Sequence, residues 1–538
     1  MVTRREFLMG AATAAGAAIL DLRPARGGPA GTDYFALHAF IEAHPDAVFI
    51  YRTNIAAKTD ADAIRAAARA LGNTLFVAAT APAGAFPVTG PVAIKPNLTS
   101  WSWDAGASTV PFEAKMGIQT DASFVEGIIG SLCDLSVPPS SIHIRDANFT
   151  AGAIDGAWYG ALAQRTGVDL AQKPLLPSLP ASDVVWTDVP GGIWYARIPY
   201  LWPAGAPGAC LINIAKLKSH SMGMTLCSKN LQGTNARPYV AHCTAWNTPM
   251  SGVSASDIVP GAFTTIEQNY ERHRETIPRW KTLDGDTHAG SAGGLWMETH
   301  TARCLDNNSA LHPLLNIIEG VYGREGPFVT GPGPDGLGVD LMANLVIFGK
   351  NARHVDLVGA YLAGHEPGNF GLFHVARERG LALYLNPFDV PLYEWTGDGS
   401  AAAASLGAFS RTPIRTLYLP QAGERQYHMV DQPFDYGTTS APRTAAPHGG
   451  PDALVIEQNF PNPFNPSTAI QYFTPRAGRV RLEIRDVRGA LVDVPFDGHA
   501  AAGDHMVTWR AGARASGTYF YSILFEGVRR TRTMVLLR

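Results

Sequence analysis

Apolar and polar positions alternate through the first 400 residues in blocks typical of strands and helices. Short runs rich in branched residues predict strands at 47–51, 74–79, 92–98, 141–146, 210–214, 314–320 and 345–349. Stretches with a helical stripe predict helices at 34–43, 60–71, from Asp121 to Leu132, at 355–362 and at 370–380. This alternation indicates an α/β fold with a mostly parallel sheet and flanking helices.

The middle of the chain concentrates chemical groups directly after one of these strands. Lys216, Lys218 and His220 occupy alternate positions, so an extended backbone would place all three side chains on one face. Lys229 and Asn230 follow on a predicted helical turn. That turn is close enough in sequence to fold back toward the same strand end.

Lysine is scarce in this chain. There are nine lysines, and three of them lie within the fourteen residues 216–229. A desolvated ammonium can shift its pKa, whereas a guanidinium stays charged, so the use of lysine here favours a site. The alternative is a solvated basic loop in which the lysines cap a helix.

Other predicted strands also end in polar residues. Lys95 and Asn97 end the strand 92–98, Asp146 ends another, and Glu325 lies in a Gly- and Pro-rich loop after 314–320. In open parallel sheets, ligands bind at the carboxyl ends of the strands, so we expect these residues at the same site. For Asn97 the alternative is a turn cap, and for Asp146 a helix N-cap.

The segment 238–303 has no clear period, and we expect an irregular insertion that shapes access to the site. It contains Trp246, Trp280 and Trp296, aromatic residues of the kind that line clefts. Its histidines are His242, His273, His288 and His300. The run 284–288 resembles part of a calcium-binding loop but lacks the remaining spacing, and we interpret it as a solvated turn.

Composition narrows the possible functions. The 538 residues are long enough for two or three domains, and 46% of them are apolar. A formal net charge of −3 with only 17% charged residues argues against nucleic-acid binding. The five cysteines form no C-x-x-C pair, so no iron–sulfur cluster is expected, and a metal ion stays open as a cofactor.

The first residues resemble a twin-arginine export signal. Thr3-Arg4-Arg5-Glu6-Phe7-Leu8 precedes an Ala- and Gly-rich run through Leu20 that is too short for a stable membrane span. The resemblance implies recognition by the twin-arginine translocase and cleavage near residues 25–30. Such signals export folded proteins, often with a cofactor already inserted.

The last 80 residues alternate with period 2 between Gly and Pro turns, which predicts a small β-sandwich. The residues Asn459 to Thr468, 480–486, 503–505, 516–521 and 534–538 resemble the immunoglobulin-like sorting domain of type IX secretion. That resemblance implies transport by the type IX machinery from the periplasm to the outside or surface of a Gram-negative cell. The expected divisions are a signal at 1–30, an α/β domain at 31–400, a linker at 401–452 and the sandwich at 453–538.

The central portion, about 90–381, resembles domain-of-unknown-function family 362. The matching segments are VAIKPNL (92–98), the start of the helix at 120–121, 142–146, 213–233, IEGVYGREGP (318–327), Asp356, Gly364, Pro367 and 380–381. Many members carry a ferredoxin-like segment with clustered cysteines, which this chain lacks. The resemblance implies a site at Lys95, Asn97, Lys216, Lys218, His220, Lys229 and Asn230 without implying its reaction.

We therefore expect an exported enzyme that binds a small anionic substrate or cofactor through its lysines. His220 would transfer a proton or bind a metal, Lys229 and Asn230 would stabilise negative charge, and Asp146 and Glu325 would be partner carboxylates. Two alternatives remain open. One is a metal- or cofactor-binding protein without turnover, and the other is a surface interaction protein that uses its Trp-rich insertion.

Overall fold

The computed structural model describes residues 33–80, 84–99, 109–147, 155–171, 175–240, 252–280, 293–421, 423–436, 454–456, 459, 467–500, 503–512 and 514–536. The predicted signal segment lies outside them. The chain divides into two compact units. One comprises Met1–Arg377 and Leu381–Phe434, and the other comprises Glu378–Gly380 and Asp435–Arg538.

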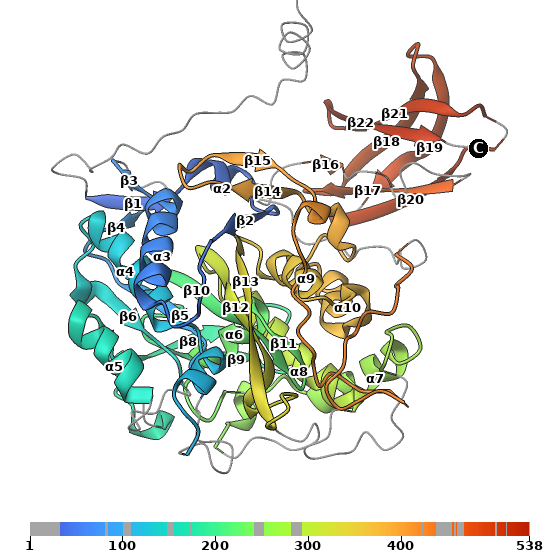
Figure 1. Ribbon diagram of the computed structural model, residues 1–538. Coiled ribbons are helices and arrows are strands. Elements are labelled where there is room, and N and C mark those ends of the chain that lie inside the picture. Colours follow the sequence, from blue (N-terminus) through green and yellow to red (C-terminus); the bar gives the residue numbers. More distant parts are fainter. Residues whose placement is uncertain are drawn as a thin grey trace, which may run out of the picture. The chain divides into compact units, whose positions relative to one another are not determined.

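A ten-stranded sheet forms the centre of the first unit (Figure 1). In spatial order its strands are β15 (Ala401–Ala403), β14 (Leu392–Trp395), β2 (Val48–Arg52), β13 (Leu337–Gly349), β12 (Leu315–Thr330), β10 (Cys210–His220), β5 (Val92–Pro96), β6 (Ile142–Ile144) and β7 (Asp169–Leu170), while β11 (Gly223–Thr225) pairs with β10. Within the described chain, β12, β10, β5, β6 and β7 form one continuous parallel block. The predicted parallel-rich sheet is thus confirmed, with antiparallel strands added on the β13 side.

Helices cover both faces of this sheet. The described helices are α2 (Ala39–Ala43), α3 (Ala61–Leu75), α4 (Ala122–Asp134), α5 (Asp155–Thr166), α6 (Cys227–Asn230), α7 (Ala262–His273), α8 (Gly294–Ala310), α9 (Ala352–Leu362) and α10 (Gly371–Glu378). The apolar sides of α3 and α4 share a core with Ile212 and Ile214 of β10. Because Asn213 points the other way and donates to the carbonyl of Cys227, α6 lies on the opposite face.

Two small sheets complete the first unit. β1 (Tyr34–Leu37) pairs with β3 (Phe76–Ala79) and β4 (Phe86–Pro87), and β8 (Val184–Asp188) forms a hairpin with β9 (Arg197–Leu201). The short 3-10 helices η2 (Glu113–Ile118) and η6 (Leu231–Thr234) lie next to the central strands. None of the helices in the described parts has the length and apolar content needed to cross a bilayer.

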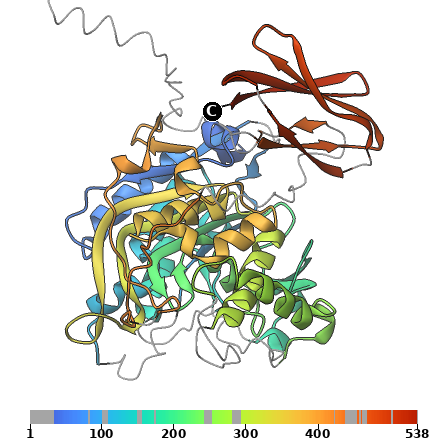
Figure 2. The same ribbon diagram turned by 90° about the vertical axis from the view of Figure 1, so that its right-hand side faces the viewer.

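The structure corrects three sequence predictions. The predicted helix at 34–43 begins as strand β1, because Phe35 and Leu37 alternate into the core beside α3. The predicted loop after residue 320 is strand, since β12 continues to Thr330 and pairs with β13 in a long hairpin (yellow in Figure 2). The insertion at 238–303 contains helix α7 and most of α8, which is buried almost throughout.

Several other predictions fall partly outside the described residues. Trp246, His242 and His288, with the run 284–288, lie outside them, whereas Trp280 and Trp296 are buried. Residues 401–421 and 423–434, expected in the linker, belong to the first unit, where β15 extends the main sheet. Among the described cysteines, Cys133, Cys210, Cys227 and Cys304 are free thiols.

The second unit consists of antiparallel strands. β16 (Val455–Ile456), β17 (Ser467–Thr474) and β20 (Gly503–Arg510) form one sheet, and β19 (Leu491–Ala500), β18 (Gly478–Asp486), β21 (Gly517–Phe525) and β22 (Val528–Leu536) form another. Ile470, Leu482, Trp509, Tyr521 and Met534 belong to a single hydrophobic core, so both sheets bury their apolar faces together.

Candidate functional site

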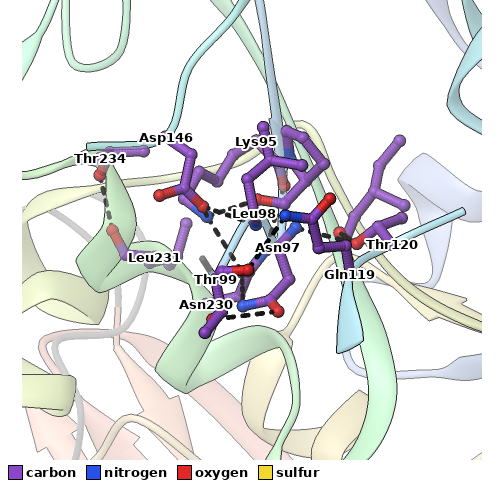
Figure 3. A network of polar contacts seen from close by, with 12 residues as sticks. Lys95, Asn97, Leu98, Thr99, Gln119, Thr120, Asp146, Asn230, Leu231 and Thr234 are labelled. Carbon is purple, nitrogen blue, oxygen red and sulfur yellow. Dashed lines mark hydrogen bonds and ion pairs between the residues drawn. The ribbon is translucent and has the colours of Figure 1, made fainter. Parts of the chain in front are cut away.

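A buried ion pair lies at the end of β5. The Nζ of Lys95 is 2.8 Å from Oδ2 of Asp146 and also donates to Oδ1 of Asn230 at 3.0 Å (Figure 3). Asp146 Oδ2 accepts a further hydrogen bond from the backbone N–H of Leu98. Burial lowers the pKa of Lys95, and the neighbouring carboxylate of Asp146 opposes that shift. The fold thus joins three predicted site residues from three elements.

Asparagine side chains extend this cluster along the same face. Asn230 donates through Nδ2 to the carbonyl of Lys95 at 3.0 Å and to Oδ1 of Asn213 at 2.8 Å, and it accepts from Nδ2 of Asn97 at 3.3 Å. Asn213 in turn donates to Asn316 of β12 at 2.9 Å. These amides therefore tie β5, β10, β12 and α6 together, and Asn97 and Asn230 are fixed in place by them.

Gly233 gives Lys95 the space that it occupies. A Cβ at residue 233 would lie 2.5 Å from Cε and 2.7 Å from Nζ of Lys95. We expect Gly233→Ala to lower the free energy of unfolding by about 1–3 kcal/mol, because the lysine must leave its carboxylate. Thermal or denaturant unfolding measures this. Gly160→Ala in α5, where nothing lies within 4 Å of the added carbon, is the matched control, and an equal loss in both variants would contradict the prediction.

A second cluster surrounds Lys216 on the opposite face of β10. Asn213 is in register with Lys95 and shares its face, whereas Lys216, three residues further along, points the other way. Its Nζ is 2.6 Å from Oε2 of Glu319 and 3.3 Å from the ring centre of Tyr322. Lys216 is completely buried, so this ion pair has no contact with solvent.

Asp121, the N-cap of α4, belongs to the Lys216 cluster. Its Oδ2 accepts from the hydroxyl of Tyr322 at 2.7 Å, and its backbone N–H donates to Glu319. Burial raises the pKa of both Asp121 and Glu319, and the ammonium of Lys216 opposes the shift. Two carboxyl groups around one buried ammonium favour retention of a proton between them.

Lys218 differs from the other two lysines of the site. It is 1% exposed, and its Nζ donates to the backbone carbonyls of Ile118 at 2.7 Å and Pro327 at 3.2 Å. Within the described residues no carboxylate lies in ion-pair distance of it. Burial lowers its pKa well below the usual value for lysine, and the positive charges of Lys229 and Arg324 add to that effect. The position therefore favours a neutral amine.

Helix α6 carries Lys229 at the edge of this site. Asp356 of α9 accepts from the backbone N–H groups of Cys227 at 2.7 Å and Ser228 at 2.8 Å, which fixes the start of the short helix. Burial raises the pKa of Asp356 to about 6. Lys229 is partly exposed, so it can meet a molecule from solvent.

The remaining predicted residues have separate partners. His220 accepts through Nδ1 from the backbone N–H of Met222 at 3.2 Å, inside the β10–β11 turn. Its ring lies 6.5 Å from that of Phe328. Glu325 is held by Arg415, at 2.6 and 2.8 Å, and so serves an ion pair with a distant segment.

Sequence reasoning did not select Glu319, Asp121 or Tyr322 for the site. Glu319 lies inside a predicted strand, and Asp121 was interpreted only as a helix cap. In the structure, Glu319 binds Lys216 and also accepts from the backbone N–H of Asp121. Helix α8 brings Cys304 within 3.3 Å of His300 and 3.1 Å of Gln232. Burial raises the pKa of this thiol to about 12, so it stays protonated.

The donors of the site suit anions. Ammonium and amide N–H groups converge at the ends of β5 and β10, and such groups bind carboxylate or phosphate oxygens. In the part of the chain that the structure describes, no group of three or more His, Cys, Asp or Glu side chains is placed to hold a metal ion.

A comparison with protein-family models matches one region of the chain, and that region contains the lysines described above. The profile of a family described as a domain of unknown function, DUF362, matches residues 92–361, half of the chain. The chain belongs to the DUF362 family. The DUF362 region includes both lysine clusters, Lys218 and α6, and excludes Arg415 and the second unit. No curated protein matches the chain.

Proposed function

We propose that this DUF362 protein is an enzyme that acts on a small anionic molecule at the carboxyl ends of β5, β10 and β12. The observation that carries the proposal is Lys218, a buried lysine that donates only to two backbone carbonyls among the described residues. Burying such a group costs stability and brings no ion pair in return. Groups with this cost and a strongly shifted pKa concentrate at functional sites.

Positive charge around Lys218 supports an anionic substrate. The positive charges of Lys229, Arg324 and Lys216 lower the pKa of Lys218, and the carboxylate of Asp146 opposes them. Arg324 lies 2.9 Å from Asp340, but the same carboxylate also binds Lys58 at 2.7 Å. One carboxylate thus lies between two cations, an arrangement that favours the approach of an anion.

Two of the lysines have a structural role, and two would bind the substrate. Lys95 and Lys216 are paired with carboxylates at 2.8 and 2.6 Å and hold the strands and helices in register. Lys218 and Lys229 would contact the substrate, with His220 as a proton carrier at the turn, while Asn230 lies on the α6 face of β10 and holds Lys95. Trp280 and Trp296 are buried, so they give no support to a surface interaction role.

Turnover distinguishes an enzyme from a binding protein. Purified protein is incubated at about a thousandth of the concentration of each compound in a mixture of anionic metabolites, and the mixture is followed by mass spectrometry. Conversion of many molecules per chain, lost in Lys229→Met and kept in Lys350→Met, is the expected result. Depletion of at most one molecule per chain would support the non-catalytic binding protein instead.

We also propose that the chain is exported and sorted. The residues 3–8 fit a twin-arginine signal, and Asn459 to Thr468 with the later strand segments fit a type IX sorting domain of immunoglobulin-like sandwich type. The shared core of the two antiparallel sheets supports the sandwich interpretation. Fractionation of cells tests this proposal: protein that stays in the cytoplasm with intact Arg4 and Arg5 would overturn it.

A further inference from the structure

Among the described residues, the Nζ of Lys218 donates to two acceptors, and a neutral amine has two N–H bonds to donate. An ammonium carries three N–H donors, whereas a neutral amine carries two and keeps a lone pair. Among the described residues, two carbonyl oxygens accept from Nζ, those of Ile118 and Pro327. When both N–H bonds point to these oxygens, the lone pair points away from them.

We propose that Lys218 is a nucleophilic amine that forms an imine with the carbonyl carbon of an anionic aldehyde or ketone. This inference rests on the proposed function and adds the chemical class of the substrate. The positive charges near Lys218 favour both the attack on the carbonyl group and the binding of the anionic group of such a molecule. Lys229 and Arg324 disfavour a proton on the amine, and the same positive field attracts the carboxylate or phosphate of the substrate.

Lys216 provides an internal comparison for this assignment. It lies two positions earlier on the same face of β10 and is equally buried, but its ammonium is 2.6 Å from the carboxylate of Glu319. A paired ammonium has no free lone pair and does not attack a carbonyl. Two neighbouring lysines on one strand thus have opposite expected reactivity, which makes the assignment testable.

A hydroxyl on the next strand is positioned to assist. Thr225 of β11 pairs directly with Lys218 of β10 in an antiparallel register, so the two side chains lie on one face of the hairpin. The hydroxyl of Thr225 is completely buried and has no hydrogen-bond partner among the residues that the structure describes. A buried hydroxyl without a partner is costly, and a substrate oxygen next to Lys218 would supply one.

The reaction balances without any oxidant or reductant. The Nζ lone pair of Lys218 attacks the carbonyl carbon, which forms a C–N bond and moves an electron pair to oxygen. The two amine hydrogens leave with that oxygen as water, and a C=N bond remains. The hydroxyl of Thr225 can donate to the oxygen while it carries charge.

Trapping of the imine tests this inference on the full-length protein. Glyoxylate, a small aldehyde with a carboxylate, is added with sodium cyanoborohydride, and peptide mass spectrometry locates the carboxymethyl group. We expect modification of Lys218 at least tenfold faster than that of Lys216 or Lys350. Modification confined to lysines that are partly exposed, such as Lys350, or none at all, would overturn the inference.

Acetaldehyde, which has the reactive group without the charge, separates this inference from the proposed function. If Lys218 is modified at least tenfold faster by glyoxylate than by acetaldehyde, the result supports both the nucleophilic amine and the anionic substrate. Equal rates would keep the nucleophilic amine but contradict the anionic substrate. Loss of the adduct in Lys218→Met, with an unchanged circular dichroism spectrum, confirms the position, and an adduct retained elsewhere on the strand would contradict it.

Discussion

Replacing Asp146 by asparagine is expected to lower the free energy of unfolding by about 3–5 kcal/mol, because it leaves the buried ammonium of Lys95 without a carboxylate. Asparagine keeps the size of the side chain and an oxygen that can accept from the N–H of Leu98. The loss therefore reports the missing charge and not a cavity. Denaturant unfolding at pH 7 measures it.

The partner substitution shows whether the loss belongs to the ion pair. In Lys95→Met/Asp146→Asn no ammonium remains without a carboxylate at this position, and stability should return to within about 2 kcal/mol of the native protein. Asp62→Asn is the control, because the Asp62 side chain is 94% exposed in its pair with Arg65 and should cost at most about 1 kcal/mol. A double variant less stable than either single variant would contradict this account.

Replacing Lys218 by methionine is expected to stabilise the protein by about 1–2 kcal/mol at pH 7. Methionine fills a similar volume and needs no hydrogen-bond partner. A gain is unusual for a buried position, where most substitutions destabilise. It would identify Lys218 as a residue kept for its chemistry at the expense of stability.

The pH dependence of this gain follows from the direction of the pKa shift. Burial lowers the pKa of Lys218 in the folded chain, so between the folded and unfolded pKa values the unfolded state binds more protons. Lys218 therefore adds stability as pH rises through this range toward the ordinary lysine value, and Lys218→Met should lose this contribution to the slope, while Lys95, whose pKa burial also lowers, keeps its own. Lys350→Met, which removes a partly exposed lysine, should leave it. A slope in Lys218→Met equal to that of the native protein would contradict the shift.

Sequence periodicity was sufficient for the local parts of this structure. The branched run after Cys210 predicts β10, and Asp121 predicts the start of α4, because a strand core and an N-cap are set by neighbouring residues. The DUF362 resemblance is confirmed over residues 92–361. Lys95, Asp146 and Asn230 lie together at the end of β5, as expected.

The partners of the lysines could not be predicted in the same way. Lys216 pairs with Glu319 103 residues away, and Glu325 pairs with Arg415 90 residues away. These pairings depend on which strands are neighbours in the sheet, and periodicity does not encode that order. Helix α8 was missed for another reason: Glu298, Arg303 and Asp306 interrupt any apolar stripe, although all are buried.

The protonation of Lys218 in the native protein tests the central claim most directly. Competitive labelling with trace acetic anhydride from pH 5 to 11, read by peptide mass spectrometry, gives the pH at which each lysine becomes reactive. We expect Lys218 to become reactive at a clearly lower pH than Lys350. A transition at the same pH as Lys350, or no labelling of Lys218 at any pH, would contradict a neutral and accessible amine at this site.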